Sequence, residues 1–163
     1  MGKLRKFPKK RYLFYYLLGI VDGEGCFSIS IKRDKGTKFG YAIDPVFHVT
    51  QSSENREVLE LLKEALSCGR IEKKSGQPGT LVFVVDNRRL LKEKIIPFFE
   101  RYGLIAKKKE FEAFKEVVER LERKEHSTYE GFMNLLKFVL SKRKRRKGKI
   151  KYGREILEKI KRK

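Results

Sequence analysis

An apolar segment that runs through two acidic residues into an alternating strand constrains this chain more than any other feature. The stretch is LLGIVDGEGCFSISI, residues 17–31. Residues 12–21 are almost entirely apolar or aromatic, which predicts a helix buried in a core or against a partner. We expect Gly23 and Gly25 to end this helix, because glycine readily adopts the left-handed conformation found past helix C-termini. Residues 26–32 alternate between apolar and polar side chains, as in a half-buried strand.

Two predicted hairpins follow from the pattern of the whole chain, and amphipathic helices separate them. The remaining strands are expected at residues 41–51, 69–74 and 81–85, and the helices at residues 53–66, 88–102, 106–123 and 129–140. This order predicts an α+β fold, in which helices cover the apolar face of a single antiparallel sheet with four strands. Pro45 has no N–H to donate, so it predicts a bulge or a sheet edge in the second strand.

The other face of this sheet is expected to be polar and partly cationic. It would carry Ser28, Ser30, Lys32, His48, Thr50, Arg70, Glu72 and Lys74. Such a face suits nucleic acid, because strands can enter the DNA major groove and reach base edges. An ordinary solvated sheet surface is the alternative interpretation.

Basic residues are concentrated at the two ends of the chain. The protein has 41 Lys and Arg against 21 Asp and Glu, a net charge of +20. An N-terminal arm, residues 1–11, carries +6, a single domain, residues 12–140, carries +3, and a C-terminal extension, residues 141–163, carries +11. Basic ends on a nearly balanced body indicate contact with a phosphate backbone. A patch that serves solubility or localisation is the alternative.

The remaining composition indicates an intracellular protein. Cys26 and Cys68 lack the spacing of a zinc site, so we expect free thiols in a reducing compartment. No apolar run approaches the roughly 20 residues of a membrane span, and no secretory signal is recognisable. A prokaryotic cytoplasm or an organelle fits these features, and secretion does not.

The acidic pair at the end of the first helix predicts a cation site. The last carbonyls of a helix lack partners and carry the negative end of its dipole. With the carboxylate of Glu24 just beyond, they would form an oxygen-rich corner that suits a hard cation such as Mg²⁺. In the alternative interpretation, Asp22 and Glu24 are ordinary turn residues.

The stretch LLGIVDGEG, residues 17–25, resembles the LAGLIDADG motif of homing endonucleases. The stretches FHVTQ, residues 47–51, and AKKKEF, residues 106–111, follow in the family's order. The resemblance covers roughly residues 12–120 and implies the family's αββαββα core. A single motif in a short chain resembles the homodimeric branch, whose copies would meet through the motif helix, Tyr12–Gly25.

The resemblance also implies the site residues. Glu24 takes the place of the family's metal-binding acid, and Gly23 would lend its carbonyl to the same divalent metal, most simply Mg²⁺. Gln51 matches a polar residue that positions solvent, and Lys107 matches a basic residue near the cut phosphate, with Lys109 as a rival. Asp22 takes a structural position. The implied catalytic set is therefore Glu24, Gln51 and Lys107.

The function that the resemblance implies is intron-encoded, metal-dependent cleavage of both DNA strands at a long, near-palindromic site. The expected DNA contacts are Ser28, Ser30, Lys32, His48, Arg70 and Lys74. The alternatives are an intron RNA maturase, a DNA-binding protein without nuclease activity, or a basic ribosomal or chromatin protein. The presence of Glu24, Gln51 and Lys107 together favours the nuclease.

Overall fold

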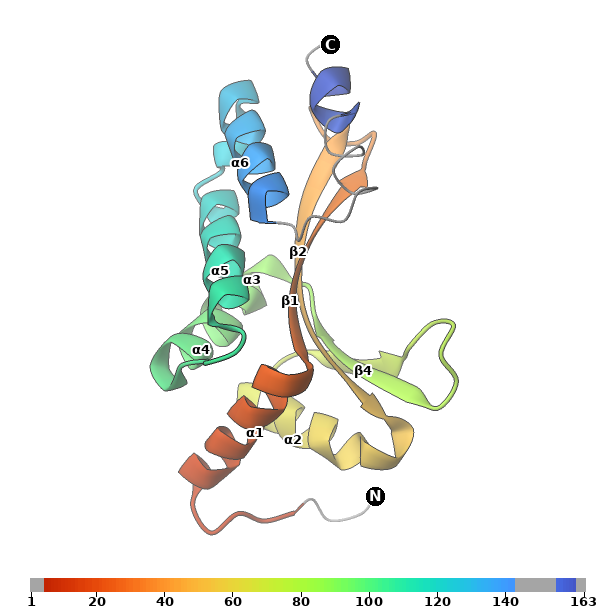
Figure 1. Cartoon of the computed structure of the whole chain (residues 1–163), viewed down its shortest axis with the longest axis vertical. Helices are drawn as coiled ribbons and strands as arrows, with labels where there is room; N and C mark the ends of the chain where they lie inside the picture. The colour runs from red at the N-terminus through yellow and green to blue at the C-terminus, as the bar shows by residue number, and fades with distance from the viewer. Residues whose placement is uncertain (1–4, 143–154, 161–163) are drawn as a thin grey trace.

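A computed structural model describes residues 5–142 and 155–160 of the chain. A helix, two hairpins and a series of helices follow one another in sequence (Figure 1). The first half contains α1 (Lys10–Glu24), β1 (Gly25–Arg33), β2 (Tyr41–Ser52), η1 (Ser53–Asn55), α2 (Arg56–Leu66), β3 (Arg70–Lys73) and β4 (Thr80–Val85). The second half contains α3 (Arg88–Leu90), η2 (Leu91–Ile95), α4 (Ile96–Tyr102), α5 (Lys108–Glu122), η3 (Glu125–Ser127) and α6 (Tyr129–Lys142). Residues 155–160 form one further helical segment.

The four strands form one antiparallel sheet in the order β1-β2-β4-β3, which confirms the predicted α+β architecture. Pro45 lies opposite Ile29 in an uninterrupted register, so the strand has no bulge there. Strand β4 pairs with β2 only from Phe47 onward, which leaves the other side of β2 open at Pro45. The edge alternative for Pro45 is therefore correct, because its missing N–H deprives no neighbouring strand of a hydrogen bond.

Helix α1 is longer than predicted and ends for a different reason. It continues through Gly23 to Glu24, and Gly25 has φ −73° and ψ 153°, which is extended backbone rather than a left-handed cap. A Cβ on Gly25 would lie 2.5 Å from the carbonyl oxygen of Val21. Glycine is needed here for space, because the chain turns from helix to strand with no intervening loop.

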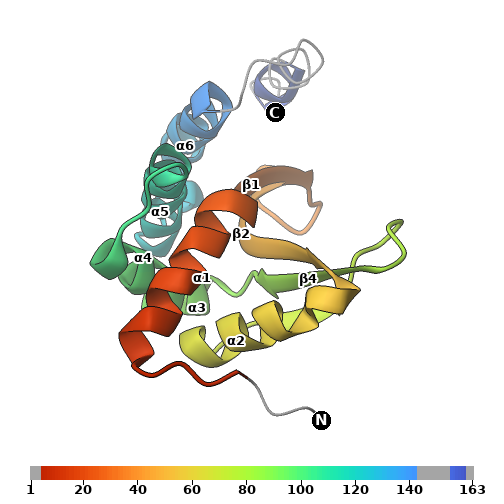
Figure 2. The same ribbon diagram turned by 60° about the horizontal axis from the view of Figure 1, so that its bottom comes forward.

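A first hydrophobic cluster joins α1 to the inner face of the sheet. Leu17 and Val21 of α1 are fully buried against Phe27, Phe47 and other side chains of the sheet, α2, α4 and α5. Figure 2 shows α1 crossing in front of this layer, with α2 on one side and α4 on the other. This packing fixes the direction in which the end of α1 points.

A second cluster lies at the far end of the β1–β2 hairpin. Ile31, Tyr41 and Ile43 pack there against α5, α6 and the helical segment 155–160. Ile156 and Ile160 are only 1% and 3% exposed. The predicted basic extension therefore contributes side chains to the core, although residues 143–154 and 161–163 lie outside the described part. The boundaries predicted at residues 11 and 140 fall inside α1 and α6.

No helix within residues 5–142 and 155–160 is long and apolar enough to cross a membrane.

Replacing both Ile156 and Ile160 with serine should detach segment 155–160 and lower the free energy of unfolding. Each buried isoleucine contributes about 1.5–3 kcal/mol, so we expect a fall in Tm of about 6 °C or more. Thermal unfolding followed by circular dichroism measures this change. The matched control replaces the exposed pair Glu158 and Lys159 with serine, which keeps the net charge. An equal fall in both variants would contradict the core role.

Candidate active site

Glu24 stands unpaired at the end of α1. Its side chain is exposed and makes no hydrogen bond or ion pair with any other residue in the described part of the chain. The neighbouring carbonyls of the last helical turn, that of Gly23 among them, lack the amide partners of a helix interior. Two kinds of hard oxygen ligand therefore meet at this corner, and both attract a cation.

The register of the sheet carries Gln51 toward the same corner. Gly25, the first residue of β1, is paired with Val49, and Gln51 follows two positions further along β2. Gln51 thus lies past the start of β1, on the side where α1 ends. Its side chain is half-buried, and its amide oxygen accepts a hydrogen bond from Nδ2 of Asn55 at 3.5 Å.

Asp22 holds the backbone at Lys107, which lies 85 residues later in the sequence, close to the end of α1. The carboxylate accepts hydrogen bonds from the backbone N–H of Ile105 at 2.9 Å and from that of Lys107 at 3.1 Å. Burial raises the pKa of Asp22, but hydrogen bonds from backbone amides outweigh it, so the pKa lies below its usual value. Asp22 therefore stays charged and holds the loop before α5.

Lys107 also lies near the start of β1. Burial raises the pKa of the Cys26 thiol, and the charge of Lys107 acts in the opposite direction on the same group. Lys109, in contrast, lines a groove between α5 and α6 together with Phe138 and Lys142. The structure thus connects Lys107, and not Lys109, to the motif through direct hydrogen bonds.

Few side-chain ligands for a metal lie at this corner among the described residues. Within the described residues no group of three or more His, Cys, Asp or Glu side chains could hold a metal ion. Glu24 is the unpaired carboxylate at this corner.

The open face of the sheet carries the side chains that the alternation predicted. The backbone register places Ser28, Ser30, Lys32, His48 and Arg70 on one face, and Lys74 follows in line, with its N–H bonded to the carbonyl of Thr80 at 3.0 Å. Figure 1 shows α5 and the neighbouring helices on the opposite side of the sheet.

Two of these cations already have anionic partners. Lys32 pairs with Asp44, and Arg70 holds both oxygens of Asp86 at 2.8 Å while its Nε donates to Glu72 at 2.9 Å. Asp44 and Asp86 were absent from the sequence-derived set. The alternation of β2 could have revealed Asp44, because it shares a face with His48, four positions on.

His48 and Lys74 remain without an ion pair in the described part of the structure. Burial lowers the pKa of His48, and the charge of Lys74 lowers it further. His48 is therefore neutral at physiological pH and can accept a hydrogen bond through one ring nitrogen. Ser30 points its hydroxyl at the carbonyl of Asp44 at 3.4 Å.

Helix α1 has one face inside the core and one face exposed. Leu18 points inward and is 8% exposed, so it contributes nothing to the outer face. The outer face carries Tyr12, Tyr15, Tyr16, Gly19 and Gly23. A Cβ added to either glycine would meet nothing within 4 Å, so the fold of a single chain does not require glycine at these positions.

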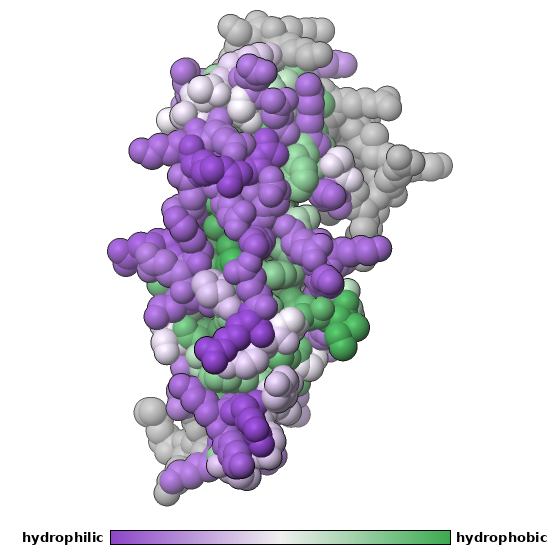
Figure 3. Space-filling model, turned by 90° about the vertical axis from the view of Figure 1, so that its left-hand side faces the viewer, coloured by the Kyte–Doolittle hydropathy of each residue, from purple (hydrophilic) through white to green (hydrophobic). Residues whose placement is uncertain are grey.

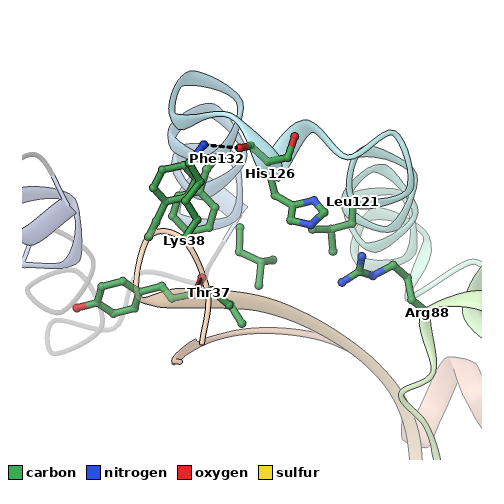
Figure 4. A pocket seen from close by; sticks show the side chains of 11 residues that line it. Thr37, Lys38, Arg88, Leu121, His126 and Phe132 are labelled. Atoms are coloured by element: carbon green, nitrogen blue, oxygen red, sulfur yellow. Dashed lines mark hydrogen bonds between the residues drawn. The ribbon is translucent and has the colours of Figure 1, made fainter. Parts of the chain in front are cut away.

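His126 belongs to a separate pocket at the far end of the molecule. This pocket of about 340 Å³ lies between the β1–β2 turn and the start of α6, and Arg88 lies at the same pocket (Figure 4). Nδ1 of His126 is buried without a hydrogen-bond partner, and burial lowers the pKa of the ring. The pocket shares no lining residue with the corner at Glu24.

Comparison with known proteins gives a consistent family match. The family model described as LAGLIDADG endonuclease matches residues 17–118. The DNA endonuclease I-CeuI of Chlamydomonas moewusii is 35% identical over 147 residues, which cover 88% of this chain and 67% of that protein. The homing endonuclease I-ApeII of Aeropyrum pernix is 38% identical over 115 residues, or 71% of this chain and 68% of that protein.

Solved structures agree with this match. An archaeal intron-encoded homing endonuclease, I-Vdi141I, complexed with DNA, superimposes with a TM-score of 0.82 at 37% identity, over 95% of this chain and all of that one. The group I intron-encoded homing endonuclease I-CeuI, complexed with DNA, gives a TM-score of 0.78 at 34% identity, over 89% of this chain and 70% of that one. At these identities the likeness covers the sequence as well as the fold.

Proposed function

This chain belongs to the LAGLIDADG endonuclease family and is a site-specific DNA endonuclease, and we propose that two copies cut both strands of a long, near-palindromic site by metal-dependent hydrolysis. The observation that carries the proposal is the corner at the end of α1. There an unpaired Glu24 carboxylate lies at the end of the helix whose Asp22 anchors the loop of Lys107. Its place of action is a prokaryotic cytoplasm or an organelle, where an intron could be inserted into a host gene.

The donors at this corner fit a divalent metal, most simply Mg²⁺. Glu24 and the carbonyl of Gly23 offer hard oxygen ligands, and exposure leaves room for the waters that Mg²⁺ retains. When bound, such ions would activate water and stabilise the leaving oxygen of the phosphodiester. In a homodimer, two Glu24 side chains, one from each copy, would hold the ions across the dimer axis.

The other residues of the site would act on the phosphate and on solvent. Lys107 would stabilise negative charge as it develops on the phosphate, because the hydrogen bond from its backbone N–H to Asp22 holds this residue near the motif. Gln51 would orient a water molecule through its amide group, which Asn55 holds in place. Neither role requires a histidine to act as general base.

The exposed face of α1 supports a homodimer. Gly19 and Gly23 lie on this face where their own chain leaves open space, and glycine costs a helix interior about 1 kcal/mol relative to alanine. Two such helices could approach closely, since the distance between helix axes depends on the side chains at the contact. A two-fold axis along α1 would match the symmetry of a near-palindromic DNA site.

The open face of the sheet would then read the DNA. Ser28, Ser30 and His48 provide hydrogen-bonding groups for base edges, whereas Lys74 provides an unpaired charge for phosphate. In Lys32 and Arg70 the charge is already shared with carboxylates of the same face. These two side chains would serve orientation more than overall affinity.

The central test is DNA cleavage by the wild type and by Glu24→Gln, which keeps the size of the side chain and removes its charge. We expect the wild type to cut both strands of the intron-less host gene with Mg²⁺ and not with EDTA. Glu24→Gln should bind the DNA and leave it intact. The matched control is Glu112→Gln, an exposed glutamate on α5.

Binding without cleavage by the wild type, across several divalent metals, would contradict the nuclease. It would favour the DNA-binding regulator or the intron RNA maturase, and an RNA splicing assay would then separate these two. Cleavage that persists in Glu24→Gln would instead remove Glu24 from the metal site.

Lys74 and Arg70 should contribute differently to DNA affinity. Each alanine variant removes one positive charge, so the long-range electrostatic change is matched. Lys74→Ala should reduce the slope of log affinity against log salt by about 1, as for one lost phosphate contact. Arg70→Ala should change this slope by much less, because Asp86 and Glu72 already hold the guanidinium. Equal slopes from filter-binding titrations would refute the distinction.

Gly19→Leu tests the homodimer. The folded chain has room for the new side chain, so the monomer should remain folded and at least as stable as the wild type. A partner helix would collide with it, and the variant should sediment as a monomer and lose double-strand cleavage. Gly19→Ala is the milder control. A Gly19→Leu protein that still sediments as a dimer would exclude this face as the interface.

A further inference from the structure

Exposed apolar side chains lie along the outer face of α1 and on the loop bonded to its end. In the described part of the chain, the large hydrophobic side chains that stay exposed are Tyr12, Tyr15, Tyr16, Ile105 and Tyr129. All except Tyr129 lie on α1 or on the loop that Asp22 holds at its end. Ile105 is the extreme case, with 91% of its surface exposed. Figure 3 shows a mostly hydrophilic face with hydrophobic surface in its lower half and a hydrophobic projection at its right-hand edge.

The backbone contacts on both sides of Ile105 hold its side chain in an exposed position. Its own N–H is bonded to Asp22, and the preceding Leu104 is 8% exposed in the main core. On the other side Gly103 has φ +76° and donates its N–H to the carbonyl of Phe99 at 2.9 Å. The side chain could not turn inward without breaking these contacts.

The surface around Ile105 is continuous with the open face of α1. Tyr102, the residue before Gly103, packs edge-on against Tyr15 with ring centroids 6.3 Å apart, and against Phe14 at 5.1 Å. Tyr15 itself is 60% exposed. A partner that covers the outer face of α1 therefore reaches the loop of Ile105 as well.

We propose that the loop Gly103–Lys107 senses the dimer: Ile105 packs against the second copy of the chain, and Asp22 converts this contact into a fixed position of Lys107. The inference rests on the proposed homodimer. It gives Asp22 the role of a positioning residue, and it makes Ile105 part of the interface.

The second copy is the occupant that the observations favour. Gly19 and Gly23 leave open space on the outer face of α1, and the loop of Ile105 is bonded to the end of the same helix, so a second copy that covers this face would reach Ile105. Ile105 offers no charge and no hydrogen-bonding group to a phosphate, and burying it twice in a two-fold dimer is favourable. DNA as the partner of Ile105 is the outcome that would overturn the proposal.

The coupling to Lys107 follows from shared hydrogen bonds. The N–H groups of Ile105 and Lys107 bind the two oxygens of one carboxylate, at 2.9 and 3.1 Å. A displacement of Ile105 must therefore move Lys107 or break one of these bonds. Contact with the partner would hold both, so that the lysine is set in place when the dimer forms.

The first experiment compares the wild type, Ile105→Ser and Ile105→Leu by sedimentation equilibrium without DNA. Ile105→Ser should raise the dissociation constant of the dimer by about tenfold or more, because an apolar contact is lost twice. Ile105→Leu keeps the apolar volume and should stay close to the wild type. Circular dichroism checks the fold of each variant.

The second experiment is a double-mutant cycle on the single-turnover cleavage rate at saturating DNA. Asp22→Asn should lower this rate at least tenfold, and should leave the DNA affinity in Ca²⁺ within about twofold, because the loop loses a charged acceptor. The double variant, with Asp22→Asn and Lys107→Ala together, should cleave DNA at nearly the same rate as Lys107→Ala alone. If the rate of the double variant falls by the product of the two single fold-changes, Asp22 acts independently of Lys107, and the coupling is overturned.

The outcomes separate this inference from the proposed function. If the wild type dimerises and Ile105→Ser dimerises equally well, the interface role of Ile105 is wrong, whatever the cleavage assay shows. If Ile105→Ser keeps the dimer and loses DNA affinity, the side chain faces DNA. A monomeric wild type would overturn the proposed homodimer itself, and with it this inference.

Discussion

The junction between α1 and β1 is the constraint on which the rest of the structure depends. Gly25 lies so close to Val21 that no side chain could fit between them, and the helix passes into the strand without a loop. The end of α1 and the start of the sheet are therefore joined directly. Glu24 sits at this junction, so the position of its backbone is set by the main core and by the pairing of Gly25 with Val49.

From this junction, two other parts of the chain are drawn to the same place. The register of β2 carries Gln51 past the start of β1, and the carboxylate of Asp22 holds the loop of Lys107. The two acids of the motif thus lie in different environments. The carboxylate of Asp22 accepts hydrogen bonds from backbone amides, whereas that of Glu24 has no partner among the described residues. An active site built in this way depends on few residues, each of them close to rigid secondary structure.

The surroundings of helix α1 explain why its sequence is apolar on nearly every side. Leu17, Leu18 and Val21 fill the core of their own chain, and the tyrosines and glycines of the outer face stay open. A helix that is half-covered in one chain and hydrophobic all round is suited to burial between two chains. The exposed isoleucine of the loop at its end extends the same surface.

The net charge of +20 does not reveal which charged side chains on the open face of the sheet already have partners. Carboxylates neutralise Lys32 and Arg70 on the open face, while Lys74 stays unpaired and His48 stays neutral. Because affinity for DNA arises mainly from phosphate contacts, the basic ends of the chain and Lys74 are expected to supply most of it. In the proposed complex with DNA, the paired cations and the serines would orient the protein and discriminate between sequences.

The sequence by itself determined the order of the elements, the single sheet and the polar face, because alternation and helical periodicity are local properties that burial must satisfy. Its resemblance to a family, carried by three separate stretches, also predicted Glu24, Gln51 and Lys107 as site residues, and these roles stay predictions. Only the tertiary structure decided how α1 ends, since the requirement for Gly25 is a close contact and not a backbone angle. The ion pair of Arg70 with Asp86, the burial of Ile156 and the hydrogen bond between Asp22 and Lys107 likewise depend on residues from separate parts of the sequence. Such contacts depend on how elements pack in space, and no local pattern encodes them.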